Sequence, residues 1–192
     1  MSLITWAYKL SEDTLAEPLP RRWAHVQGVA RRARELRPLF SERDAEVLEA
    51  AAVLHDIGYA PALATTGFHP LDGARFLRDQ VQADERVVSL VAHHSFALLE
   101  AEERGLRDEL ETEFDLERPE LVDAMVFCDM TTTPDGCVTS IRARVSEIQD
   151  RYGPGELVTR FIKRATPGIH AAADRVEARL AATRAVAIAQ PM

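Results

Sequence analysis

The sequence predicts an all-α protein that forms a single domain. Apolar residues recur at helical spacing along most of the chain, whereas the alternation of polar and apolar residues that marks half-buried strands is scarce. The chain has 192 residues, of which 46% are hydrophobic and 28% are charged, and this length supports one full core rather than two. No repeat or low-complexity linker divides the sequence. We therefore expect one helical domain over residues 1–192.

Two helices are predicted in the first third of the chain. From residue 21 to residue 36 the apolar residues lie at steps of three and four, and prolines stand at the first turn and at the exit. A second helix should begin at Ser41, whose hydroxyl can cap its first turn, and should end near Gly58. The segment PALATTGF at residues 61–68 then indicates a loop.

The rest of the chain shows further helical patterns separated by turn residues. The acidic stretch 96–115 should contain one helix followed by a surface excursion. Other helices are predicted over residues 70–80, 83–95, 117–130, 138–152, 155–165 and 168–189. The turns TTTPDG and YGPG, together with Pro167, separate the last four. The apolar face of residues 177–189 should close either the core or a dimer, and we favour the core. Residues 138–189 would then pack on a motif-bearing core at residues 21–131.

The charge and the apolar runs of the chain argue against several classes of protein. A formal net charge of −8 does not suit a surface for long nucleic acids, which needs clustered basic side chains. The two cysteines, Cys128 and Cys137, are too few for a disulfide framework. Residues 1–10 lack the features of a signal peptide, and no window approaches the roughly 20 apolar residues of a membrane-spanning helix. We expect a cytoplasmic monomer or homodimer without a membrane partner.

The stretch AAAVLHDIGYAP at residues 50–61 places two polar residues in an apolar seam. Ala and Leu favour a helix and Gly58 suits the position after a helix end, so His55 and Asp56 should be buried there. Burial of an ionised carboxylate is costly unless hydrogen-bond donors or an opposite charge compensate it. Asp56 therefore needs a partner.

A set of histidines and aspartates could share one cation with this residue. Its members lie near the ends of predicted apolar helices: His25, His55, His69, His93, Asp56 and Asp129. Taken singly, a buried histidine is more often a hydrogen-bonded core residue than a ligand, and a buried aspartate more often caps a helix or pairs with arginine. Together they offer imidazole and carboxylate ligands, which suit iron, manganese, zinc and related divalent ions. Such a cation would be the partner that Asp56 needs.

The order of these motifs resembles that of the HD superfamily of metal-dependent phosphohydrolases. The resemblance covers about residues 21–131 and implies an all-α fold with the metal site in the centre of the helical bundle. A bare His-Asp dipeptide is weakly specific, whereas the ordered set is strongly specific. The set consists of RWAHV around His25, LHDIGYAP around His55 and Asp56, FHPLDGARFL around His69, VAHHS around His93 and His94, and FCDM around Asp129.

The resemblance also implies how one or two divalent ions would be held. The expected ligands of the first ion are His25, His55, Asp56 and Asp129. In binuclear members a second ion is bridged to the first through the aspartate of the His-Asp pair, and here His69 and His93 resemble its further ligands. His94 is an alternative to His93, a substrate contact or a structural neighbour, and we favour His93 as the ligand. Iron, manganese, nickel, cobalt, zinc and magnesium are all candidates for the ion.

Three further side chains near the predicted ligands have two interpretations each. Arg22 precedes His25 by three residues and Arg75 follows His69 by six, so either guanidinium could bind a substrate phosphate. A surface position is the competing interpretation of both arginines. Asp72, about one helical turn after His69, either accepts the imidazole N–H or is a solvated carboxylate at a helix start.

The expected chemistry is hydrolysis of a phosphate ester or anhydride. A bound divalent ion lowers the pKa of water enough to supply a nucleophile near neutral pH. The expected substrate is a nucleotide or another small phosphorylated metabolite. Two alternatives stay open: an HD-fold diiron oxygenase, because the same ligands suit that chemistry, and a non-catalytic module that binds metal and nucleotide.

Overall fold

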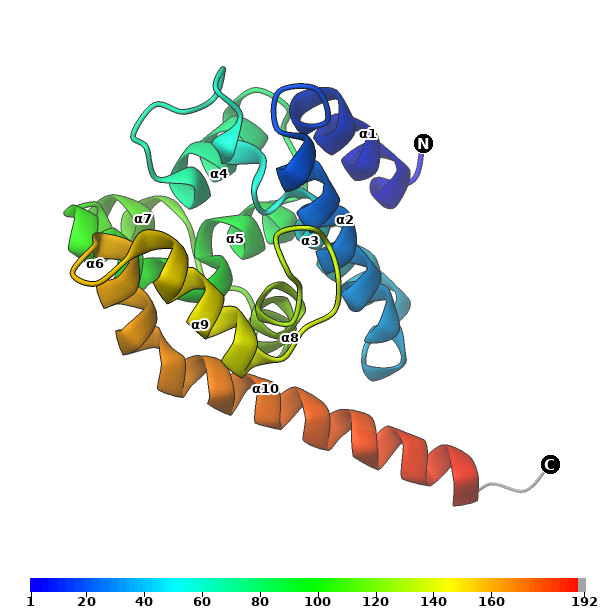
Figure 1. The fold of residues 1–192 in the computed structure, drawn as a ribbon. Coiled ribbons are helices and arrows are strands. Elements are labelled where there is room, and N and C mark those ends of the chain that lie inside the picture. Colours follow the sequence, from blue (N-terminus) through cyan, green and yellow to red (C-terminus); the bar gives the residue numbers. More distant parts are fainter. Residues whose placement is uncertain (190–192) are drawn as a thin grey trace.

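Helices account for nearly all the regular structure of the chain. The computed structural model describes the backbone of residues 1–189 and the side chains of residues 1–185. No strand occurs in this part of the chain, so the predicted all-α fold is confirmed (Figure 1). Three 3₁₀ turns accompany the helices: η1 (Arg37–Leu39), η2 (Ile57–Tyr59) and η3 (His94–Phe96). The α-helices are α1 (Leu3–Leu15), α2 (Pro20–Glu35), α3 (Glu42–Leu54), α4 (His69–Asp79), α5 (Glu85–His93), α6 (Ala97–Arg104), α7 (Arg107–Glu113), α8 (Pro119–Met130), α9 (Ile141–Tyr152) and α10 (Leu157–Ala189).

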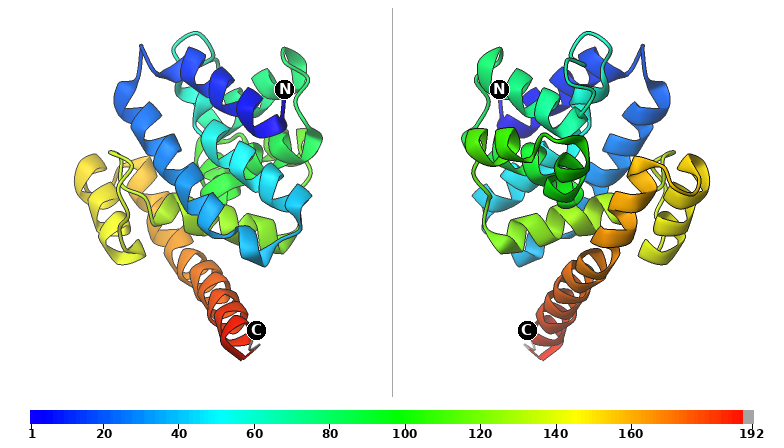
Figure 2. Two further views of the ribbon diagram at one scale, coloured as in Figure 1. Left: turned by 90° about the vertical axis from the view of Figure 1, so that its right-hand side faces the viewer. Right: turned by 90° about the vertical axis from the view of Figure 1, so that its left-hand side faces the viewer.

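Helix α3 runs through the centre of the molecule. Ser41 caps its first turn by accepting a hydrogen bond from the N–H of Asp44, as predicted. Every side chain from Val47 to Leu54 is buried, and α1, α2, α5 and α8 pack around it (Figures 1 and 2). Because α3 is enclosed in this way, the residues that follow its C-terminus lie in the interior of the protein.

Helix α1 is absent from the predictions but covers one side of α3. The hydroxyl of Ser2 accepts a hydrogen bond from the N–H of Thr5 and so caps its first turn. Ala7 and Leu15 are buried. The hydroxyl of Ser11 donates to the carbonyl of Val53 at 2.7 Å, which joins α1 to the middle of the core.

Two predicted boundaries are wrong. The stretch 96–115 forms two helices, because Gly105, with a φ of 72°, ends α6 before α7 begins. Residues 157–189 form one helix, and Pro167 lies inside it rather than between two. A proline inside a helix costs roughly 3 kcal/mol. The buried face of α10, which includes Phe161 and Ile169, offsets this cost by packing on both sides of the proline.

Helices α9 and α10 form an outer layer of the molecule. The first half of α10 packs against α6, α8 and α9, and its later turns extend beyond the other helices (Figure 2). The apolar face expected over residues 177–189 falls partly outside the side chains that are described, and within them Leu180 packs against the core. No described helix is long and apolar enough to cross a bilayer.

Candidate metal centre

The site is built around His55 and Asp56, the two residues after α3. Both are almost completely buried, with 1% and 3% of their surface exposed. The chain then turns sharply through η2 and passes against the first turn of α4. Gly58 permits this approach, because a Cβ atom there would lie 2.1 Å from the carbonyl oxygen of His69. The turn therefore holds Asp56 next to the start of α4.

Helices α2 and α8 add His25 and Asp129 to the same place. The loop after α8 packs closely on α2, since a Cβ atom on Gly28 would lie 2.6 Å from Gly136. In this loop the carbonyl of Thr133 accepts a hydrogen bond from Nδ1 of His25 at 2.9 Å. The loop that follows the Asp129 helix thus orients the imidazole of His25.

Helix α4 and the turn η3 supply His69 and His94. Nδ1 of His94 donates to the carbonyl of Val91 at 2.7 Å. The next two residues, Ser95 and Phe96, have positive φ angles of 49° and 64°, which are uncommon for residues other than glycine. In this conformation the hydroxyl of Ser95 donates to Oδ2 of Asp129. The unusual backbone therefore links the His94 turn to the carboxylate on α8.

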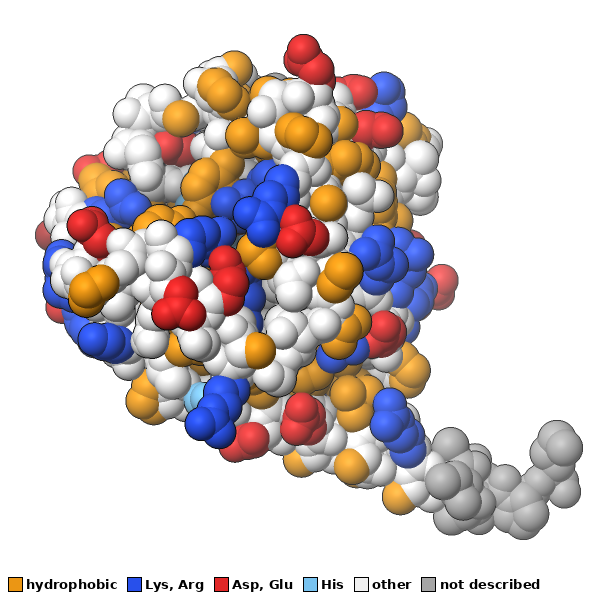
Figure 3. All heavy atoms as spheres, viewed as in Figure 1, with side chains coloured by type: hydrophobic (Ala, Val, Ile, Leu, Met, Phe, Trp, Pro, Cys, Tyr) orange, Lys and Arg blue, Asp and Glu red, His pale blue; other side chains and the backbone are white. Residues whose placement is uncertain are grey.

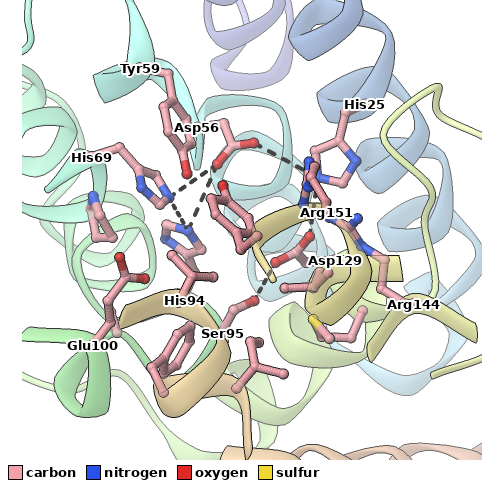
Figure 4. A pocket seen from close by; sticks show the side chains of 18 of the residues that line it. His25, Asp56, Tyr59, His69, His94, Ser95, Glu100, Asp129, Arg144 and Arg151 are labelled. Carbon is pink, nitrogen blue, oxygen red and sulfur yellow. Dashed lines mark hydrogen bonds and ion pairs between the residues drawn. The ribbon is translucent and has the colours of Figure 1, made fainter. Parts of the chain in front are cut away.

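These elements bring the nitrogen and oxygen atoms of six residues within a few ångströms of one another, and all of them except His55 are labelled in Figure 4. Nε2 of His25 lies 3.1 Å from Oδ1 of Asp129, and Nε2 of His55 lies 3.4 Å from Oδ2 of Asp56. Nε2 of His69 lies 3.2 Å from Oδ1 of Asp56. His94 completes the group from the other side, with its Nε2 3.1 Å from Nε2 of His69. Two sets of ligand atoms each lie within 4.8 Å of one another: His25, His55 and Asp129, and His55, Asp56 and His94.

The proton positions in this cluster fit a cation. Nδ1 of His55 donates to the carbonyl of Ala52 at 2.8 Å, so Nε2 carries no proton when the ring is neutral. Burial lowers the pKa of His55 to about 4, which keeps the ring neutral near pH 7. Its buried Nε2 has no hydrogen-bond partner in the described part of the chain and faces the carboxylates of Asp56 and Asp129. A lone pair between two carboxylates is the arrangement that a divalent ion satisfies.

Both carboxylates stay ionised despite their burial. Burial acts to raise the pKa of Asp56, but the charge of Arg22 and the neighbouring His55 and His69 hold it well below its usual range. Nη1 of Arg22 donates to Oδ2 of Asp56 at 2.6 Å, and its guanidinium stacks 4.1 Å from the ring centre of Tyr59. One partner that Asp56 requires is therefore Arg22. Its other oxygen faces the imidazoles of His69 and His94.

The structure corrects the choice between the two adjacent histidines. Nε2 of His93 donates to the carbonyl of Phe114 at 2.7 Å, so this side chain points toward the segment after α7 and away from the cluster. His94 lies in the cluster instead. Helix α5 ends at His93, and the turn η3 that follows directs the side chain of His94 into the cluster.

Two other candidate residues lie outside the cluster. Arg75 binds Glu109 and Glu113 of α7 and does not line the cavity at the cluster, which supports its surface interpretation. Asp72 accepts hydrogen bonds from the backbone N–H groups of residues 65–67 and so orders the loop before α4. It is therefore neither a solvated carboxylate nor a partner of His69.

A cavity of about 170 Å³ opens beside the cluster. Arg22, predicted near a substrate, lines it. Several residues absent from the predictions line it too, among them Tyr59, Ser95, Glu100, Arg144 and Arg151. Basic side chains gather between α2 and α9 on this face of the molecule (Figure 3). Arg144 interrupts the apolar stripe that Ile141, Val145 and Ile148 form on α9. A charged residue within an apolar stripe is the one sequence signal that would have singled out Arg144 as a buried arginine.

Comparison with protein families supports the predicted resemblance. The family model described as HD domain matches residues 22–130, the segment that contains every residue of the His and Asp cluster. Comparisons with curated proteins and with solved structures gave no match.

Proposed function

This chain belongs to the HD domain family, and on that premise we propose that it is a metal-dependent phosphohydrolase for a nucleotide or another small phosphorylated metabolite. Members of the family bind divalent metals and are mostly hydrolases of this type. The observation that carries the proposal is the buried Nε2 of His55, which lacks a proton and a hydrogen-bond partner among the described residues and faces two ionised carboxylates. Such an atom suits a ligand of a cation rather than a core hydrogen bond.

The proposed ligands fall into two groups that share Asp56. His25, His55, Asp56 and Asp129 would hold one ion, and Asp56, His69 and His94 would hold a second. A divalent ion in this position supplies Lewis acidity, lowering the pKa of water and offsetting charge on phosphoryl oxygens. The metal is proposed to be iron, manganese, nickel, cobalt, zinc or magnesium.

Hydrogen bonds from the chain itself hold the proposed ligands in place. The carbonyls of Thr133, Ala52 and Val91 accept from Nδ1 of three histidines, which directs each Nε2 into the centre. Arg22 binds the oxygen of Asp56 that faces His25, and Ser95 binds Asp129. The three carbonyl contacts and the Ser95 contact orient the proposed ligand atoms toward the centre of the cluster.

The surroundings of the cluster support a small phosphorylated substrate. Arg22, Arg144 and Arg151 line the cavity, and guanidinium groups bind phosphate oxygens well. The acidic charge of the whole chain supports a small molecule rather than a long nucleic acid. We propose a cytoplasmic location, and either a monomer or a homodimer would suit a site whose proposed ligands all come from one chain.

Metal analysis followed by a phosphate-release screen tests the proposal. Protein purified without oxygen should contain one or two divalent ions per chain by elemental analysis. With iron, manganese, cobalt, nickel or magnesium supplied, it should release phosphate from at least one nucleotide or small phosphate ester. Absence of bound metal under all these conditions would refute the proposal. Turnover that requires oxygen would support the diiron oxygenase instead, and tight nucleotide binding without phosphate release would support a binding module.

A further inference from the structure

Helix α9 places two arginines at the cavity from outside the segment that the family model matches. Arg144 and Arg151 lie two turns apart on α9 and both line the cavity with the His and Asp cluster (Figure 4). The HD domain match ends at residue 130. The role of these arginines therefore has to be argued from their own surroundings.

Arg144 is buried although it carries a permanent charge. Only 6% of its side chain is exposed. Its Nη1 donates to Glu147 one turn along the helix, while its Nε has no hydrogen-bond partner among the described residues. An unsatisfied polar atom at a buried position costs about 1–3 kcal/mol. The guanidinium lines the cavity, so an anion there would lie beside a buried charge whose partner is the partly exposed carboxylate of Glu147.

Arg151 lies at the rim of the same cavity. Its side chain is 32% exposed, and its nearest carboxylate oxygen, on Glu147, lies 3.4 Å away. Glu147 is itself more than one third exposed, so this ion pair is weak. Arg151 can therefore exchange Glu147 for a more favourable anion at little cost.

The wall next to these arginines is apolar. Ile148 on α9 and Val158, Phe161 and Ile162 on α10 line the cavity together with Tyr152. Such side chains favour an apolar or aromatic group over a hydrated polyol, since each buried methylene contributes about 0.8 kcal/mol. The cavity therefore has a charged part beside the cluster and an apolar part formed by α9 and α10.

We infer that Arg144 and Arg151 bind the phosphoryl group of the substrate and that the apolar wall contacts its organic part. The substrate class is then a phosphate monoester of an aromatic or apolar group, such as a nucleobase-bearing or phenyl group. This inference rests on the proposed function, because it places the phosphoryl group beside the metal cluster.

Binding of inorganic phosphate to metal-loaded full-length protein tests the role of the arginines. Isothermal titration calorimetry should show an affinity about 10-fold to 100-fold lower for Arg144→Gln and Arg151→Gln than for wild type, the loss expected for a charge-assisted hydrogen bond. Arg142→Gln is the matched control, because Arg142 is exposed on the same helix and does not line the cavity. Its phosphate affinity should equal that of wild type.

The design separates the two proposals. Elemental analysis of the same samples should show equal metal content in wild type and variants. Wild-type phosphate affinity in both cavity variants, with metal present, would overturn the inference and leave the proposed function intact; absence of metal in wild type would refute the proposed function itself. Should Arg144→Gln fail to fold, Arg151→Gln at the rim decides the question alone.

Competition between two phosphonates tests the apolar wall, because a phosphohydrolase does not cleave their C–P bond. Phenylphosphonate should displace inorganic phosphate at a concentration about 10-fold lower than methylphosphonate does, because only phenylphosphonate buries an apolar ring. Equal displacement by both phosphonates would overturn the assignment of the organic part. This comparison uses unmodified protein, so folding of a variant does not affect its outcome.

Discussion

Gly58 determines whether the two halves of the His and Asp cluster can meet. It lies in η2, between Asp56 and Tyr59, and its Cα faces the first turn of α4. In Gly58→Ala the added Cβ atom would lie 2.1 Å from the carbonyl oxygen of His69 and 2.6 Å from the backbone nitrogen of Gly73. Both atoms belong to a helix backbone, so no side-chain rotation can relieve the overlap.

The size of the required movement follows from these distances. Ordinary van der Waals contact begins near 3.4 Å, so η2 and α4 must separate by about 1.3 Å, the difference between 3.4 and 2.1 Å. Nε2 of His69 now lies 3.2 Å from Oδ1 of Asp56, and that separation would increase by a similar amount. We expect the strain to cost about 3 kcal/mol, the upper part of the range for overpacked cores.

Thermal unfolding and metal analysis measure the two consequences. For a chain of this length about 3 kcal/mol corresponds to a decrease of roughly 6–12 °C in the unfolding midpoint. Bound metal should fall because His69 no longer faces Asp56. Gly73→Ala is the matched control: its Cβ atom would lie 3.1 Å from the backbone nitrogen of Gly58, and the helix propensity gained, about 1 kcal/mol, offsets that milder contact. A Gly58→Ala protein with the wild-type midpoint and metal content would refute this reasoning.

Four other predictions follow from the cluster. His94→Ala should lower the metal content per chain and His93→Ala should not, because the Nε2 of His93 is bonded to a carbonyl; equal losses by elemental analysis would contradict the geometry. Asp56→Asn should remove most bound metal while circular dichroism shows the helix content of wild type, and unchanged metal content would exclude Asp56 as a ligand. Arg75→Gln should leave phosphate release unchanged, since Arg75 binds two glutamates of α7; a tenfold loss in a steady-state assay would place it at the substrate. Metal at 100 times its Kd should raise the free energy of unfolding by about 2.7 kcal/mol, and a melting midpoint indifferent to metal and to chelator would argue against a bound ion.

Several residues of the His and Asp cluster could be predicted because they lie in short motifs at the ends of helices. His55 and Asp56 follow an apolar stretch that must be buried, so their own burial follows from the sequence alone. His25 lies on the buried face of the amphipathic helix α2, and Asp129 lies near the end of α8, where every residue from Ala124 to Met130 is buried; their side chains meet in the centre. These positions depend mainly on local periodicity, which a sequence contains in full.

The choice between His93 and His94 required the tertiary structure. Adjacent residues in a helix point about 100° apart, so His93 and His94 face different parts of the protein, and which one meets the cluster depends on how α5 and the turn after it are oriented. The chain leaves the helix at this point through a turn that includes two residues with positive φ. No pattern of apolar residues encodes that turn, because its geometry depends on the contact between Ser95 and Asp129 across the core.

The sequence by itself determined the helical fold and the side-chain types of the His and Asp cluster, because hydrophobic periodicity and side-chain type are properties of each segment. The tertiary structure decided which side chains share a cavity. Arg144 lies next to cavity residues that are far from it in the chain. Arg75 forms ion pairs with α7 instead of lining the cavity. Helix α10 continues through Pro167 without a break. The physical reason is that these outcomes depend on packing between distant helices, whose free energy outweighs local preferences.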